Sequence, residues 1–139
     1  MKIARMIVVL SAVAGLSTGC ATHSVMRMSN AVSVKNKPAT TYAAHKNKVF
    51  VTESVLAGSV QCERLGQIDV GMVTYASKDE VLKRMANKAR ELGADAVVEV
   101  RTWYQPAGWA WRAPQGTGQA IKLTDKSAVD FSKVTGDWH

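Results

Sequence analysis

The sequence predicts an α+β fold, in which a small mixed four-stranded sheet carries one main helix in the order β-β-α-β-β. Three observations predict this fold. Apolar residues recur at helical spacing over 78–92, they alternate with polar residues on both sides of that segment, and the links between helix and strands are short. The 77 residues from 48 to 124 include 25 of the types Ile, Leu, Val, Met, Phe, Trp and Tyr, which is enough for one small core but not for two.

Two strands are expected in the first half of this domain. Residues 48–53 (KVFVTE) are rich in β-branched side chains and alternate, which predicts a strand. Residues 54–62 contain a glycine and predict a turn. A second strand follows over 64–73, where Gly66 indicates a bulge or a bend.

The helix has the strongest local signals. Ser77 followed by Glu80 matches a capping box, in which the serine accepts from a backbone N–H of the first turn. Gly93 supplies a left-handed C-terminal cap, so the helix is expected over 78–92. The apolar stripe that should face the sheet consists of Val81, Leu82, Met85, Ala86, Ala89 and Leu92. The face that should meet water consists of Lys83, Arg84, Asn87, Lys88, Arg90 and Glu91.

The second half of the domain predicts two more strands. Residues 94–103 (ADAVVEVRTW) follow the helix directly, and a strand, helix and strand with short links imply a right-handed crossover and a parallel pair. Residues 119–124 (QAIKLT) predict a last strand, which pairs with the previous one across a long loop over 104–118. Residues 125–139 are polar and are expected to form a loose C-terminal tail.

The first nineteen residues predict an export signal. Lys2 and Arg5 form a positive region, and residues 6–16 form an apolar stretch that is too short for a permanent membrane span. Residues 16–20 (LSTGC) resemble the lipobox of bacterial lipoproteins, in which the signal is cut before the cysteine and the cysteine is acylated. The resemblance implies a lipidated Cys20. Two or three acyl chains, at ~0.8 kcal/mol per buried CH₂, hold a protein on a membrane essentially permanently.

The residue after the cysteine indicates the destination of the protein. In Gram-negative lipoproteins an aspartate at this position usually retains the protein in the inner membrane, and here it is Ala21. The resemblance therefore implies the outer membrane. Residues 20–47 have no acidic residue and are rich in Ser, Thr, Asn, Lys and Ala, which predicts a mostly extended basic tether with a possible short strand near 32–34.

Three stretches carry a further resemblance. Residues 49–52 (VFVT), 65–68 (LGQI) and 89–98 (ARELGADAVV) look like a small α+β domain family, which includes the lipoprotein sensor of the Rcs envelope-stress pathway and the YbjQ-type domains that carry a heavy-metal-binding description. The resemblance implies the fold and, more weakly, a sensory role. The Rcs sensor is held by disulfides within its domain, whereas this chain keeps only Cys62 once Cys20 is acylated.

The residues do not predict an enzyme. His23 and His45 fall in the tether and His139 is the last residue, so the domain has no histidine to act in a catalytic triad. A metal-binding module is the alternative function, because soft metals bind Cys, Met and His. Cys62, Met72 and Met85 lack a paired spacing, however, so no metal or other cofactor site is assigned. Burial is the expected state of Cys62, and pairing with another chain is the alternative.

Aromatic residues are concentrated in the segment 103–112. Trp103 continues the strand before the loop and is expected in the core. Trp109 and Trp111 alternate around one alanine, so in an extended loop they would point the same way, with Arg112 beside them. Packing beneath the loop is the other explanation for these indoles. Because Trp and Arg are enriched at binding hot spots, Trp109, Trp111 and Arg112 are the candidate partner-binding site.

These observations together predict a non-catalytic protein of the cell envelope. Lys and Arg number 18 against 11 Asp and Glu, which gives +7, and removal of Lys2 and Arg5 with the signal leaves +5 without any basic run, so a nucleic acid is not an expected partner. The expected protein is anchored by lipid in the outer membrane, faces the periplasm, and binds an envelope protein in stress sensing or envelope support. A homo-oligomer remains an open alternative.

Overall fold

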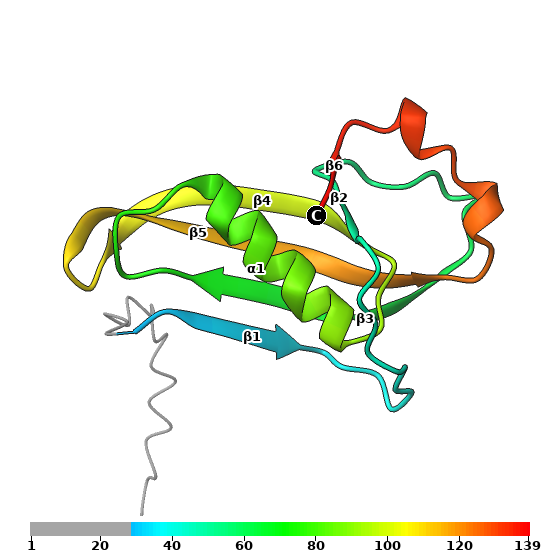
Figure 1. Cartoon of the computed structure of the whole chain (residues 1–139), viewed down its shortest axis with the longest axis horizontal. Coiled ribbons are helices and arrows are strands. Elements are labelled where there is room, and N and C mark those ends of the chain that lie inside the picture. The colour runs from blue at the N-terminus through cyan, green and yellow to red at the C-terminus, as the bar shows by residue number, and fades with distance from the viewer. Residues whose placement is uncertain (1–28) are drawn as a thin grey trace, which may run out of the picture.

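The computed structural model describes residues 29–139 as one sheet with a helix packed across it (Figure 1). The signal sequence, Cys20 and the first part of the expected tether lie outside the described residues. Within residues 29–139, no helix is long and apolar enough to cross a membrane. The strands are β1 (Ala31–Lys35), β2 (Phe50–Val51), β3 (Cys62–Gly71), β4 (Ala96–Ala107), β5 (Ala110–Leu123) and β6 (Asp137–Trp138), and the helix is α1 (Lys78–Glu91).

The sheet has six strands rather than the four predicted, in the order β1-β3-β5-β4-β2-β6. The two additional strands come from segments expected to be outside the domain, because β1 pairs antiparallel with β3 and β6 pairs antiparallel with β2. The crossover from β3 through α1 to β4 does not give a neighbouring parallel pair, since β5 lies between these two strands and is antiparallel to both. The parallel neighbours are β2 and β4.

The helix agrees with its prediction at both ends. The Ser77 side chain accepts from the N–H of Glu80 at 3.3 Å. The Glu80 carboxylate, however, pairs with Arg84 at 3.0 Å instead of returning to the N-cap. Leu92 caps the C-terminus, and Gly93 follows with φ 76°, the left-handed conformation that a helix stop requires.

Two apolar clusters lie on opposite faces of the sheet. The first joins the buried face of α1 to β3, β4 and β5, and includes the fully buried Val81 and Met85. In β4, Val97 belongs to this first cluster, whereas its neighbours Ala96 and Val98 belong to the second, as strand alternation requires. The second cluster is completed by half-buried residues of the 52–61 loop and the C-terminal segment, namely Leu56, Val60, Val129, Phe131 and Val134.

The loop expected over 104–118 is not a loop. Strands β4 and β5 continue through it as one long antiparallel hairpin, with Ala107 paired to Ala110 across a two-residue turn. Gly108 is the first central residue of this turn and has φ 55°, which suits glycine and the right-handed twist of the strands. Prolines and glycines interrupt the apolar alternation here, so the sequence pattern did not indicate the strands.

Both terminal segments pack on the domain: the short strand expected near residues 32–34 is present as β1, whereas the C-terminal segment is not the loose tail that was predicted. Residues 31–35 form β1 at the sheet edge, within the expected tether, and Lys35 pairs with Asp69 of β3 at 2.7 Å. At the other end, the Phe131 ring lies 4.7 Å from that of Phe50 and 5.1 Å from that of Trp138. The folded domain therefore extends from about residue 30 to the last residue.

Candidate functional site

The β4–β5 hairpin places two of the three candidate binding residues at its tip. Trp109 occupies the turn and is 85% exposed, and Trp111 begins β5 and is 83% exposed. The residues beside them, Ala107 and Ala110, are buried with Val73 in a small apolar cluster under the turn. Small side chains thus anchor the turn while the large indoles stand in water, so the indoles are not the packing that holds this segment.

Trp103 is not in the core, and its predicted burial is wrong. It is 43% exposed, and its indole N–H donates to the Gln105 side chain at 3.0 Å. The cause is an irregularity of β4 between Val98 and Arg101, where Glu99 adopts φ 55°. One residue is added there, so Val97 and Val100 both face the helix and every later position is reversed. Trp103 therefore lies on the face away from α1.

Arg112 is exposed at the tip, but its aromatic partner is not one of the tryptophans. Its guanidinium carbon lies 4.3 Å from the centre of the Tyr104 ring, and the Lys78 ammonium lies 5.5 Å from the same ring. The Tyr75 hydroxyl accepts from the backbone N–H of Trp111 at 3.4 Å. Two tyrosines and a lysine thus join the site. The apolar pattern holds no signal for Tyr104, because the extra residue at Glu99 decides on which face of the sheet it lies.

The hairpin tip is connected to the first described residues of the chain. The Asn30 side-chain oxygen accepts from the backbone N–H of Val73 at 2.9 Å, and the Val73 carbonyl accepts from the N–H of Trp109 at 3.3 Å. In Figure 1 the start of β1, the turn between β3 and α1, and the β4–β5 turn gather at the same end of the molecule. The segment that leads toward Cys20 thus enters the domain beside the exposed indoles.

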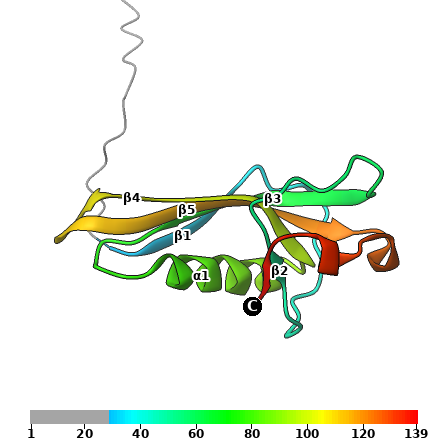
Figure 2. The ribbon, with the colours of Figure 1, turned by 90° about the horizontal axis from the view of Figure 1, so that it is seen from above.

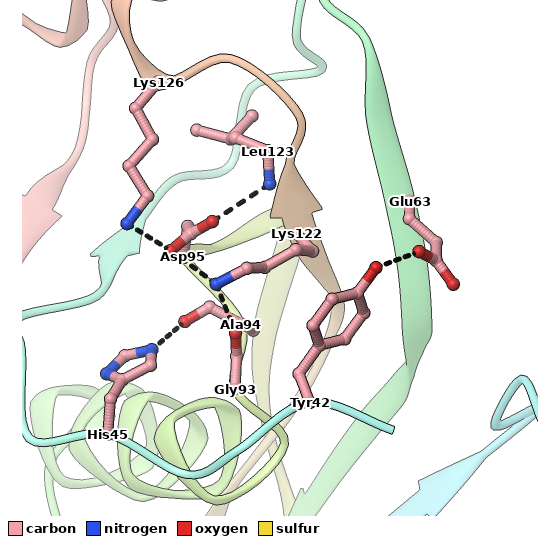
Figure 3. Close-up of polar contacts among 9 residues, drawn as sticks. All are labelled: Tyr42, His45, Glu63, Gly93, Ala94, Asp95, Lys122, Leu123 and Lys126. Atoms are coloured by element: carbon pink, nitrogen blue, oxygen red, sulfur yellow. Dashed lines mark hydrogen bonds and ion pairs between the residues drawn. The ribbon is translucent and has the colours of Figure 1, made fainter. Parts of the chain in front are cut away.

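A second cluster of charged groups surrounds Asp95 at the other end of α1 (Figure 3). Asp95 is buried, and its carboxylate accepts from the Leu123 N–H at 3.1 Å, from Lys122 Nζ at 3.3 Å and from Lys126 Nζ at 2.8 Å. Burial alone would raise the pKa of Asp95. The hydrogen bonds from Lys126, Leu123 and Lys122 outweigh burial and hold this pKa below its ordinary value.

The same cluster fastens the N-terminal segment to the domain (Figure 3). His45 Nε2 donates to the Ala94 carbonyl at 2.7 Å, and the Tyr42 hydroxyl donates to Glu63 at 2.5 Å. The hydrogen bond to Glu63, with burial as a smaller cause, raises the pKa of Tyr42. The side chains of Tyr42, Asp95 and Lys122 each bond to another segment of the fold, and His45 does so through Nε2 while its Nδ1 is buried without a partner. The cluster therefore serves to join segments.

Cys62 is exposed at the start of β3, so its expected burial is wrong. Cys62 is the first residue of β3 and precedes the buried residues of that strand, which explains its exposure. Met72 and Met85, the other soft ligands considered, are both buried in the apolar cluster under α1. Within the described part of the chain, no group of three His, Cys, Asp or Glu residues could hold a metal ion. These residues do not form a site that fits a soft metal.

Comparison with known proteins gives one match. Neither the search of curated proteins nor the search of solved structures finds a significant similarity to this chain. The segment from residue 70 to residue 124, which runs from the end of β3 to the end of β5, matches the model of a protein family described as "Putative heavy-metal-binding", the YbjQ type.

Proposed function

We propose that this chain is a lipid-anchored lipoprotein of the outer membrane that faces the periplasm and acts by binding rather than by catalysis. The observation that carries the proposal is the hairpin tip, where Trp109 and Trp111 stand almost fully exposed on a turn anchored by small residues. A domain of this size normally buries or lacks such side chains, and exposed aromatic groups mark interaction surfaces. The tip is therefore the binding surface of the domain.

The start of the fold supports an anchor at Cys20. The domain begins near Asn30, only ten residues after the cysteine of the lipobox-like segment LSTGC. An acylated Cys20 would thus keep the whole domain close to the membrane surface. Stress sensing and envelope support are both roles that such a membrane-held binding domain can perform, and an envelope protein is the partner that either role requires.

Catalysis and metal binding have less support from the residues. Residues 70–124, which match the family described as heavy-metal-binding, contain no cysteine and no histidine. Their two methionines are core residues, so the description of the family is not carried over to this chain. Of the histidines in the described residues, His45 uses Nε2 to bond to the Ala94 carbonyl and so fastens the N-terminal segment, which gives no support to a role as the base of a nucleophile pair.

Replacement of Cys20 by alanine tests the anchor. We expect Cys20→Ala to leave the precursor uncut and to release the protein from outer-membrane fractions after a high-salt wash. Cys62→Ala is the matched control, because it removes the other cysteine and should leave fractionation unchanged. Intact mass of the purified protein gives the direct readout, and a mature chain without acyl mass would refute the proposal.

A further inference from the structure

The end of the molecule that carries the hairpin tip is both aromatic and basic. Tyr75 is 67% exposed on the turn before α1 and contacts the backbone of Trp111, and Trp103 adds a third partly exposed indole. Figure 2 shows the β4–β5 turn projecting beyond the helix at this end. The large exposed apolar side chains of the described chain are thus concentrated here, with Val55 and Trp138 as the exceptions elsewhere.

The two segments that form the turn before α1 and the β4–β5 hairpin carry positive charges only, although Asp79 and Glu80 follow in the first turn of the helix. These segments, 72–78 and 100–118, contain no aspartate or glutamate. Their charged residues are Lys78, Arg101 and Arg112, and two of these cations lie over the Tyr104 ring. The segment 21–30, which leads into the domain at the same end, has no acidic residue either. An anionic surface would meet no repulsion from any of these segments.

Covalent geometry limits how far this end can lie from Cys20. Ten residues separate Cys20 from Asn30, and a fully extended chain spans at most about 3.5 Å per residue, or about 35 Å in all. Asn30 and Trp109 are each hydrogen-bonded to the backbone of Val73. A lipidated Cys20 would therefore hold the indoles within reach of the same membrane.

We propose that the β4–β5 hairpin tip inserts Trp109 and Trp111 into the headgroup region of the membrane, as a second, reversible contact beside the acylated Cys20. This inference rests on the proposed lipid anchor and names the partner of the tip. Indoles favour this region because the ring is apolar while its N–H can still bond to water and headgroups. Lys78 and Arg112, which lie over the Tyr104 ring, add attraction to anionic lipids.

The contact would fix the orientation of the domain. One tether of ten residues does not by itself fix the orientation of the domain. With a second contact at the hairpin tip, the long axis of the sheet would point away from the membrane surface. The opposite end, with the 52–61 loop and the C-terminal segment, then faces the periplasm.

Fluorescence quenching by brominated lipids tests the proposal. The full lipidated protein is purified from membranes and reconstituted in vesicles of phosphatidylcholine and phosphatidylglycerol, with or without bromine on the acyl chains. We expect bromine to quench the intact protein and Trp138→Phe strongly. Trp109→Phe/Trp111→Phe should lose most of that quenching while its melting temperature stays the same. In vesicles without phosphatidylglycerol the quenching should fall, since the basic residues then lose their partner.

The outcomes separate this inference from the proposed function. A protein that carries no acyl mass refutes the anchor, and the inference falls with it. An acylated protein that stays in the vesicles, but whose Trp109 and Trp111 are quenched by aqueous acrylamide and not by bromine, refutes the inference alone. Shielding from acrylamide only when native envelope proteins are added, without quenching by bromine, assigns the tip to a protein partner and refutes the inference as well.

Discussion

Asp95 illustrates what single residues contribute to this fold. Its place two residues after the helix stop at Gly93 can be recognised in the sequence, and the structure adds the two lysines and the backbone N–H that it accepts from. Lys122 and Lys126 lie 27 and 31 residues further along the chain, so only the folded sheet brings them to the carboxylate. Local patterns can thus identify a residue of this kind but cannot identify its partners.

Asp95 should make stability depend on pH. Asp95→Asn removes the charge from three hydrogen bonds, and we expect a loss of about 1–2 kcal/mol of unfolding free energy at pH 7, since Lys126 is partly exposed and the pair is screened. The pKa of Asp95 is lowered in the folded state from an ordinary value of 3.8, so its contribution is complete above that pH and disappears as the pH falls through the folded pKa. Urea unfolding from pH 7 to pH 3 measures this.

The unfolding free energies of the wild-type protein and of Asp95→Asn, measured as a function of pH, test whether the Asp95 charge stabilises the fold. The stability difference between the wild-type protein and Asp95→Asn should begin to shrink near pH 3.8, the ordinary pKa of the carboxyl group, and should vanish only when the pH has fallen below the lowered pKa of the folded state. Asp137→Asn, which changes an exposed carboxylate, serves as the control and should follow the wild type throughout. Parallel curves for wild type and Asp95→Asn would mean that the lysines add no stability.

At the scale of elements, those that could be predicted are those whose sequence signals lie close together in the chain. The helix could be predicted because its cap, its apolar stripe and its stop all lie within seventeen residues, from Ser77 to Gly93. The long hairpin could not, because its outer half is paired through backbone groups and carries alanine, glycine and proline instead of β-branched residues. Trp103 was misplaced for a related reason, since the extra residue at Glu99 leaves no mark in the apolar pattern.

The helix offers a graded test of its packing. Met85 is fully buried against the sheet, so Met85→Ala should lower the unfolding free energy by about 2–5 kcal/mol. Leu82 is only half-buried, and Leu82→Ala should cost less than Met85→Ala, although both were predicted to face the sheet. Lys83→Ala, whose side chain is 58% exposed in a pair with Asp79, should cost less than about 1 kcal/mol. Chemical denaturation of the three variants gives the ranking, and equal losses at Leu82 and Lys83 would contradict the helical phase.

At the scale of the whole molecule, the terminal segments complete the domain. Residues 31–35 add an edge strand, and Tyr42 and His45 bind to β3 and to the end of α1. The N-terminal segment before residue 48 and the C-terminal segment 125–139 are both polar in composition, so the sequence pattern indicated a tether and a tail. A few apolar residues at the right positions are sufficient once a sheet face is available to receive them, and that face exists only in the folded state.

The C-terminal segment gives the sharpest test of this arrangement. Phe131 is half-buried against the rings of Phe50 and Trp138, which also contact each other, so Phe131→Ala removes one member of a three-ring cluster on one face of the sheet. We expect a loss of about 2–3 kcal/mol, at the lower end of the range for Phe→Ala because the ring is not fully buried. Trp138 should also become more accessible to acrylamide, which a merely weakened distant core would not cause.

Lys133→Ala is the matched control, because Lys133 lies two residues away in the same short helical turn and is 82% exposed in a pair with Asp130. A surface pair of this kind contributes about 0–1 kcal/mol, so this variant should melt like the wild type. If the C-terminal segment did not pack on the domain, Phe131→Ala and Lys133→Ala would have the same melting temperature and the same acrylamide quenching of Trp138. A difference of two kilocalories or more per mole, in the range given for buried apolar truncations, would instead establish the last fifteen residues as part of the core.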